Sequence, residues 1–262
     1  MRNLPSLVAL CLAAVAVLVV AIASASQVGS EGQVASFEAK LSPASLPRDR
    51  SVPVQIRAEG EFLATPENHL AQLVSLEIGV NRHGKLITKG LPICHLRQLV
   101  ATTTQEALRI CGPAVVGHGI IRATTAFPEQ KRSHYRAAIF AFNGKRKGGG
   151  TAIFLHIHGS APGPFTVVIP VSVRRMQGTF GTTFFAKLPP FARRWAYLTK
   201  FRFVIGRRFV ADGKKLSVLR ASCPAPKGLN GAIFPFARAT YRFLTTKTLR
   251  TTLVGGCHVR KE

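Results

Sequence analysis

The sequence predicts an all-β protein, and three observations favour that fold class. Short segments in which apolar and polar residues alternate recur from Val52 to the end of the chain. Turn-forming residues separate these segments at close spacing, as at Asn143-Gly144 and Asp212-Gly213. A single segment has helical spacing. We therefore expect an antiparallel fold, either a two-sheet sandwich, which we favour, or a curved half-barrel closed by the helix.

The first segments are expected in this order. Residues 26–50 are small, polar and proline-bearing, so we interpret them as an extended lead-in with little structure of its own. Val54, Ile56 and Phe62 then indicate a first strand pair within a single β-rich domain, residues 51–262. Residues 73–80 and 85–88, joined by a turn, are typical of a hairpin.

One short helix is expected near residues 95–110. Leu96, Leu99 and Val100 are spaced three to four residues apart, and Ala107 continues their face. Gly112 and the proline after it would end the helix.

The rest of the chain is expected to form strands. The segment 165–173 is apolar on both faces and should lie in the centre of a sheet. Phe201 and Phe203 alternate with Lys200 and Arg202, so one face should bury aromatic rings while the other shows charge. The expected strands are 115–125, 135–142, 151–158, 165–173, 182–188, 197–205, 216–223, 239–244 and 251–259.

The N-terminus has the layout of a secretory signal peptide over residues 1–25. Arg2 precedes an uncharged apolar run from Leu7 to Ala23, and small residues follow at the expected cleavage point after Ala25. The alternative is an uncleaved anchor, because the run approaches the roughly 20 residues that span a bilayer. Either interpretation predicts a secreted or cell-envelope location.

Four further cysteines agree with export, because disulfides persist outside the cytoplasm. Three pairings are possible. We predict Cys94 with Cys111 and Cys223 with Cys257, since each pair is near in sequence and closes a modest loop. Metal binding by these cysteines is disfavoured because no C-x-x-C spacing occurs.

Positive charge is concentrated in the second half of the chain. Residues 27–130 are almost neutral, whereas residues 131–262 carry a net charge of +23, with Asp212 and Glu262 as their acids. Such a surface attracts polyanions, although charge can also serve solubility alone. The candidate anion-binding residues come from three basic clusters: Lys145, Arg146 and Lys147; Arg174 and Arg175; Arg207 and Arg208.

Catalytic and metal sites are not expected. The chain has no G-x-S-x-G or H-E-x-x-H motif and no phosphate-binding glycine loop. His156 and His158 would share one strand face, but no third metal ligand lies near them in sequence. Asp49 and Asp212 are the aspartates, and paired-carboxylate chemistry needs two acids close together. We therefore predict no catalytic residue, no metal and no cofactor.

Several short motifs resemble a group of exported bacterial proteins of unknown function. The resemblance covers most of the chain after the signal sequence and implies no activity and no functional residue. It rests on residues 41–47, Gly90-Leu91-Pro92-Ile93-Cys94, Cys111-Gly112-Pro113-Ala114-Val115-Val116-Gly117 and Phe142-Asn143-Gly144.

The function expected from the sequence is binding without catalysis. The basic second half would bind an anionic envelope component such as a lipid headgroup, wall polymer or polysaccharide. Nucleic acid is a less favoured partner, because no known nucleic-acid module is visible. The alternative function belongs to the half-barrel, in which an apolar cavity would carry a lipid or another apolar ligand. Periplasmic lipoprotein carriers share that architecture, and the likeness extends no further.

Overall fold

The computed structural model describes residues 24–127, 129, 131–160, 163–211, 213–244 and 248–260. The expected signal peptide therefore lies outside the described residues, apart from Ser24 and Ala25 at the start of the first strand.

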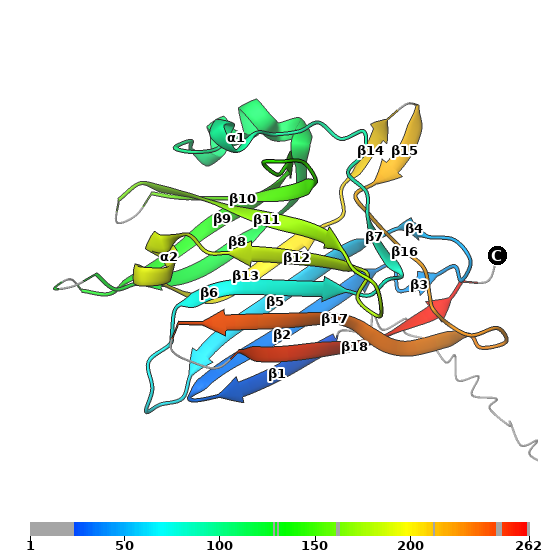
Figure 1. Cartoon of the computed structure of the whole chain (residues 1–262), viewed down its shortest axis with the longest axis horizontal. Coiled ribbons are helices and arrows are strands. Elements are labelled where there is room, and N and C mark those ends of the chain that lie inside the picture. Colours follow the sequence, from blue (N-terminus) through cyan, green and yellow to red (C-terminus); the bar gives the residue numbers. More distant parts are fainter. Residues whose placement is uncertain are drawn as a thin grey trace, which may run out of the picture.

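Most of the described chain forms one large sheet that curls into a half-barrel (Figure 1). Neighbouring strands pair antiparallel, apart from the last pair, which is parallel. The order across the sheet is β1 (Ser24–Ser30), β2 (Gln33–Ser42), β5 (Gln55–Ala64), β13 (Ala196–Ile205), β8 (Val115–Thr125), β9 (Ser133–Lys145), β10 (Thr151–Gly159), β11 (Phe165–Arg175), β12 (Thr182–Lys187), β6 (Leu73–Val80), β17 (Gly231–Phe243), β18 (Leu249–Val259) and β3 (Ser45–Leu46).

The all-β class is confirmed, and the half-barrel is the architecture that the strands adopt. Each strand in the order above is hydrogen-bonded to the next, so the strands form one continuous ladder and are not divided between two facing sheets. β11 lies between β10 and β12, as its two apolar faces predicted.

Residues 26–50 do not form the expected lead-in. They contain most of β1, all of β2 and all of β3, which belong to the main sheet. Ala35, Phe37 and Ala39 of β2 face inward and are buried. Lys40, the residue after Ala39, is exposed. This segment thus follows the alternation of a half-buried strand.

One side of the half-barrel is packed solid. Cα atoms of β1 approach those of β18 to within 8 Å, so the two edges of the sheet lie side by side (Figure 1). Inside the half-barrel, Phe62 of β5 contacts Tyr241 and Phe243 of β17 edge to face, with ring centroids 5.4 and 5.9 Å apart. Leu249 and Leu253 of β18 complete this cluster.

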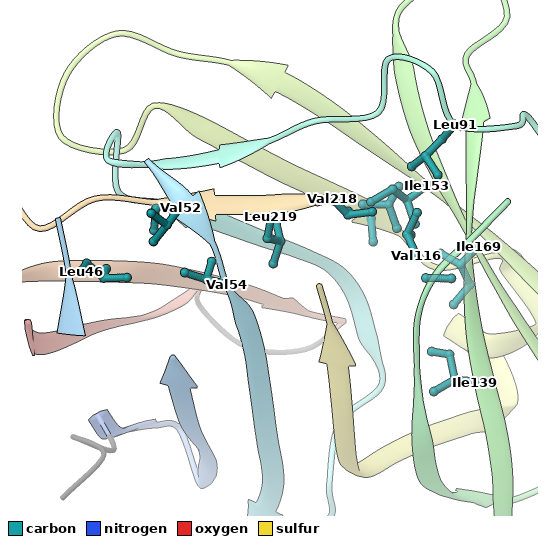
Figure 2. Close-up of a cluster of buried hydrophobic side chains, with 14 of the residues drawn as sticks. Leu46, Val52, Val54, Leu91, Val116, Ile139, Ile153, Ile169, Val218 and Leu219 are labelled. Atoms are coloured by element: carbon teal, nitrogen blue, oxygen red, sulfur yellow. The ribbon is translucent and has the colours of Figure 1, made fainter. Parts of the chain in front are cut away.

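Small elements cover one end of the half-barrel. β4 (Val52–Pro53), β16 (Leu219–Ala221) and β7 (Gly84–Leu86) form a three-stranded sheet, and β14 (Arg208–Ala211) pairs with β15 (Lys214–Ser217). Figure 2 shows Leu219 and Val218 between Val54 on one side and Val116 of the main sheet on the other. The small sheet therefore shares its core with the half-barrel.

The expected helix is present as a 3₁₀ turn, η1 (Leu96–Gln98), followed by α1 (Thr104–Cys111) and a second turn, η2 (Gly112–Ala114). Thr103 caps α1, because its hydroxyl accepts a hydrogen bond from the Glu106 amide while the Glu106 carboxylate accepts one from the Thr103 amide. A further short helix, α2 (Pro190–Trp195), was not expected.

Both predicted disulfides are confirmed. Cys94 pairs with Cys111, and Cys223 pairs with Cys257. The first holds α1 against the outer face of the sheet, where Leu99 and Ala107 pack on Phe142 and Phe154. The disulfides indicate an oxidising, extracytoplasmic location.

Candidate ligand-binding cavity

A cavity of about 560 Å³ lies inside the half-barrel. Alternate residues of its strands line it, and most of them are aliphatic or aromatic. They include Leu41, Ile56, Leu76, Ile78, Ile121, Ile139, Ile153, Leu155, Ile157, Val167, Ile169, Phe184, Leu198, Phe201, Phe203 and Ile205. Because the described lining includes no acidic residue, this space is suited to an apolar molecule.

The cavity exists because small side chains stand among the large ones. Ala58, Ala123, Ala141 and Ala186 point inward from four different strands and line the cavity. On the packed side, by contrast, the corresponding space is filled by aromatic rings such as those of Phe62 and Tyr241. Side-chain size thus divides the interior into a solid part and a hollow part.

Polar groups line the cavity at the end covered by β7 and β16. The Lys85 side chain is exposed, and the Arg220 guanidinium donates a hydrogen bond to the Ser51 carbonyl. His83 Nδ1 lies 3.4 Å from Ser222 Oγ. Partial burial lowers the pKa of His83 below its usual value, and the positive charges of Arg82 and Lys85 lower it further. We call this the basic end of the cavity.

Aromatic side chains line the opposite end. Tyr135 and Phe165 meet edge to face with ring centroids 5.3 Å apart, and Phe127 lies 5.8 Å from Trp195 of α2. The hydroxyl of Thr125 donates to Tyr135 Oη at 3.2 Å. Gly163 and Pro164, which also line this end, are exposed, so the cavity extends to surface residues here.

A smaller hollow of about 320 Å³ adjoins the basic end, and we call it the polar hollow. Leu86 and Thr182 line both it and the cavity. Its other lining residues are Ile87, Thr88, Lys89, Thr151, Val173 and Arg175.

The predicted anion-binding residues occupy three places at one end of the sheet. Lys145 is the last residue of β9, opposite Thr151, and Arg146 and Lys147 follow it in the β9–β10 turn. Arg175 lines the polar hollow, while Arg174 is its neighbour on the strand and is not part of that lining. Arg207 precedes β14, and Arg208 is the first residue of that strand. β14 projects away from the main sheet (Figure 1).

Arg207 has a structural contact that the sequence did not reveal. Its Nη1 donates to the carbonyl oxygens of Gly112, Pro113 and Val115, at 3.2, 2.8 and 3.0 Å. The guanidinium therefore binds η2 and the start of β8. Arg208 and residues 145–147 are exposed.

The two strand histidines do not form a metal site among the described residues, where no group of three His, Cys, Asp or Glu side chains could hold an ion. His156 is fully buried beneath the loop before α1, and its Nε2 lies 3.0 Å from the Thr102 carbonyl. His158 Nδ1 lies 3.0 Å from the Thr166 hydroxyl. The His156 contact, and the hydrogen bond that the Thr166 hydroxyl donates to the same carbonyl, tie the loop to the sheet.

The glutamates of β5 lie in ion pairs. Glu59 accepts hydrogen bonds from Arg202 at 2.9 and 3.2 Å and lies 2.9 Å from the Lys200 ammonium. The Arg202 hydrogen bonds, with those of Lys200, lower the pKa of Glu59 to about 2. Glu61 also faces Lys200, at 3.6 Å. A carboxylate with such a low pKa stays ionised at neutral pH and is a poor general acid.

Sequence reasoning named Arg175, which lines the polar hollow, but missed the other residues that define the site. Alternation marked the inward positions, but it did not show that Lys85 and Lys89, near the expected hairpin 85–88, meet Arg220 of the expected strand 216–223 and the polar ends of the neighbouring strands. The one signal in the sequence was that residues at inward-facing strand positions change from apolar to polar at the ends of the strands.

Comparisons with known proteins found no match, whether to a family model, to a curated protein or to a solved structure. Within the described ranges, no helix has the length and apolar character needed to cross a membrane.

Proposed function

We propose that this protein is a non-catalytic carrier that holds the apolar part of a lipid, or of another apolar ligand, inside the half-barrel. The observation that carries the proposal is the cavity of about 560 Å³ with its apolar lining. Ligand pockets in proteins measure about 300–1,000 Å³ and are lined mainly by hydrophobic side chains. An apolar cavity also favours an apolar occupant over water, because water there lacks hydrogen-bond partners.

The arrangement of polar residues favours carriage over chemistry. The described lining of the cavity contains no carboxylate, and its histidine, His83, is held near a serine hydroxyl at the rim. The low-pKa glutamate, Glu59, is engaged by Lys200 and Arg202, the charged residues that alternate with inward Phe201. A ligand inside would therefore contact mostly apolar side chains that exclude water, with no carboxylate in the described lining.

Binding of an anionic envelope component is the second candidate. It is favoured by the position of Lys145, Arg175 and Lys89 at one end of the sheet. A salt titration tests it: binding to anionic liposomes or wall polymer should weaken as salt rises, and salt-insensitive or absent binding to every polyanion would end it.

The carrier function is tested with an uncharged ligand, so that surface charge plays no part. We expect a nonionic alkyl glycoside, titrated below its micelle concentration in a calorimeter, to bind with a negative heat-capacity change, the marker of apolar burial. Absence of saturable binding for alkyl chains of every length tried would overturn the proposal.

A matched pair of variants locates the binding. Ala123 points into the cavity, so Ala123→Phe should fill it and weaken binding by roughly tenfold or more, since several buried methylenes of ligand are excluded. Ala138 lies between two inward residues of β9 and faces outward, so Ala138→Phe is the control. Equal weakening by both variants would contradict binding inside the half-barrel.

A further inference from the structure

Three neighbouring strands change from apolar to polar at the same end of the cavity. On β11 the inward row runs through Val167, Ile169 and Val171 in the cavity and continues through Val173 to Arg175 in the polar hollow. Since alternate residues of a strand are about 6.6–6.8 Å apart, Val171 and Arg175 are separated by roughly 13 Å along it. One strand thus spans the apolar and the cationic surface.

The strands on either side repeat this pattern. On β10 the inward residues Ile157, Leu155 and Ile153 line the cavity, and the next inward residue, Thr151, lines the polar hollow. On β12 Phe184 lines the cavity, and Thr182 lines both spaces. The combined surface is therefore amphipathic along its length, which matches a molecule with an apolar tail and a polar head.

The polar hollow has the composition of an anion site. Lys89 and Arg175 supply two cations, and Thr88, Thr151 and Thr182 supply hydroxyl groups. Neither cation forms an ion pair within the described part of the chain, and no described acidic residue lines the hollow. Both cations are exposed to solvent and so are accessible to a ligand.

We propose that the polar hollow binds the phosphate headgroup of a lipid whose tail occupies the cavity. This inference rests on the proposed carrier function and names the class of ligand, an anionic phospholipid. The guanidinium of Arg175 matches a phosphate in a bidentate manner, the Lys89 ammonium adds a point charge, and the threonine hydroxyls donate to the remaining oxygens. A hollow of about 320 Å³ has room for such a group.

The test compares three probes with the intact protein. The first is a short-chain phosphatidic acid, the second is the diacylglycerol with the same chains, and the third is inorganic phosphate. We expect phosphatidic acid to bind at least tenfold more tightly than the diacylglycerol, because charge-assisted hydrogen bonds add to the burial of the same tails. We expect inorganic phosphate to bind far more weakly than either lipid.

Adjacent arginines supply the matched variants. Arg175→Gln, alone and with Lys89→Gln, should remove most of the preference for phosphatidic acid and leave diacylglycerol binding unchanged. Arg174→Gln removes the same charge from the next residue, which does not line the hollow, and should preserve the preference. All these residues are exposed, so the variants should fold.

The outcomes separate this inference from the carrier function. Equal affinity for phosphatidic acid and diacylglycerol would overturn the headgroup site while the carrier function stands. No binding of either lipid would overturn both proposals. If inorganic phosphate bound as tightly as phosphatidic acid, the hollow would be a site for free phosphate. If Arg174→Gln reduced the preference for phosphatidic acid as much as Arg175→Gln, the preference would come from general surface charge. Either result would overturn the lipid headgroup site.

Discussion

The rings of Phe62 and Tyr241 meet edge to face, with centroids 5.4 Å apart, and so connect β5 to β17 across the interior of the half-barrel. Both side chains are almost completely buried. Neither side chain lines the ligand cavity, although their strands do, so the contact fills a part of the interior that the cavity does not reach. This solid part lets another part remain hollow, because it supplies dense packing that an open interior lacks.

Phe62→Ala should therefore destabilise the protein by about 3–5 kcal/mol, the usual effect of removing a large buried aromatic side chain. Leu63→Ala is the control, since Leu63 is the next residue and is 53% exposed. Its change should stay within about 0.5 kcal/mol. Urea unfolding measures both. A loss of less than about 1 kcal/mol for Phe62→Ala would show that the aromatic cluster does not support the fold.

The two disulfides should each contribute about 3 kcal/mol to the free energy of unfolding. The cysteines are 17 residues apart in the first disulfide and 34 in the second, so loop closure favours Cys223–Cys257 by about 0.6 kcal/mol. Double Cys→Ala variants, unfolded in denaturant, measure each contribution. Unchanged stability after removal of Cys94–Cys111 would mean that this disulfide does not hold α1 in place.

Acid should reveal the ion pairs of Glu59. Its pKa is lowered to about 2 by the hydrogen bonds from Arg202 and Lys200. A carboxylate whose pKa is lower in the folded protein than in the unfolded chain stabilises the fold at pH values above its unfolded pKa. That stabilisation is lost as the pH falls towards 2. The stability difference between the wild type and Glu59→Gln should thus shrink between about pH 5 and pH 2.

The control for Glu59 is Glu67→Gln, because Glu67 is exposed in a loop. Its stability difference from the wild type should stay near zero across the same pH range. A wild-type advantage over Glu59→Gln that persists unchanged at pH 2 would contradict the ion-pair account.

His156 should make the protein sensitive to mild acid. Burial lowers the pKa of this imidazole, and its Nδ1 is buried without a hydrogen-bond partner among the described residues. The unfolded chain therefore binds a proton more readily than the folded one, so stability falls as the pH drops below about 6.5. His156→Gln should lower stability at pH 8 and flatten its decrease between pH 7 and pH 5. An unchanged pH profile would show that another group causes the sensitivity.

Local patterns predicted the strands well because they depend on neighbouring residues. The alternation of Phe201 and Phe203 with charged residues predicted β13, and the two apolar faces of residues 165–173 predicted the central position of β11. The same alternation was present in β2, where Ala35, Phe37 and Ala39 face inward, but small and polar residues made the segment resemble a linker. The small size of most of its side chains is the reason that the sequence did not indicate this strand.

The choice of a half-barrel and the presence of the cavity could not be predicted in this way. An inward row looks the same whether it faces a second sheet or an open interior, and only the facing side chains decide between them. Ala123 and Ala141 line the cavity together with side chains from strands far apart in the sequence, and local patterns do not show which side chains come together. The polar hollow likewise joins Lys89 to Arg175 through tertiary structure.

Photo-crosslinking with a lipid that carries a diazirine near the end of one alkyl chain tests the carrier function most directly. After irradiation and digestion, mass spectrometry should place the adducts on inward residues of β8, β9 and β10, such as Ile121, Ile139 and Leu155, and Ala123→Phe should suppress them. Adducts confined to outward residues of the same strands, or no adduct above that of an unrelated exported protein, would contradict binding of an apolar chain inside the half-barrel.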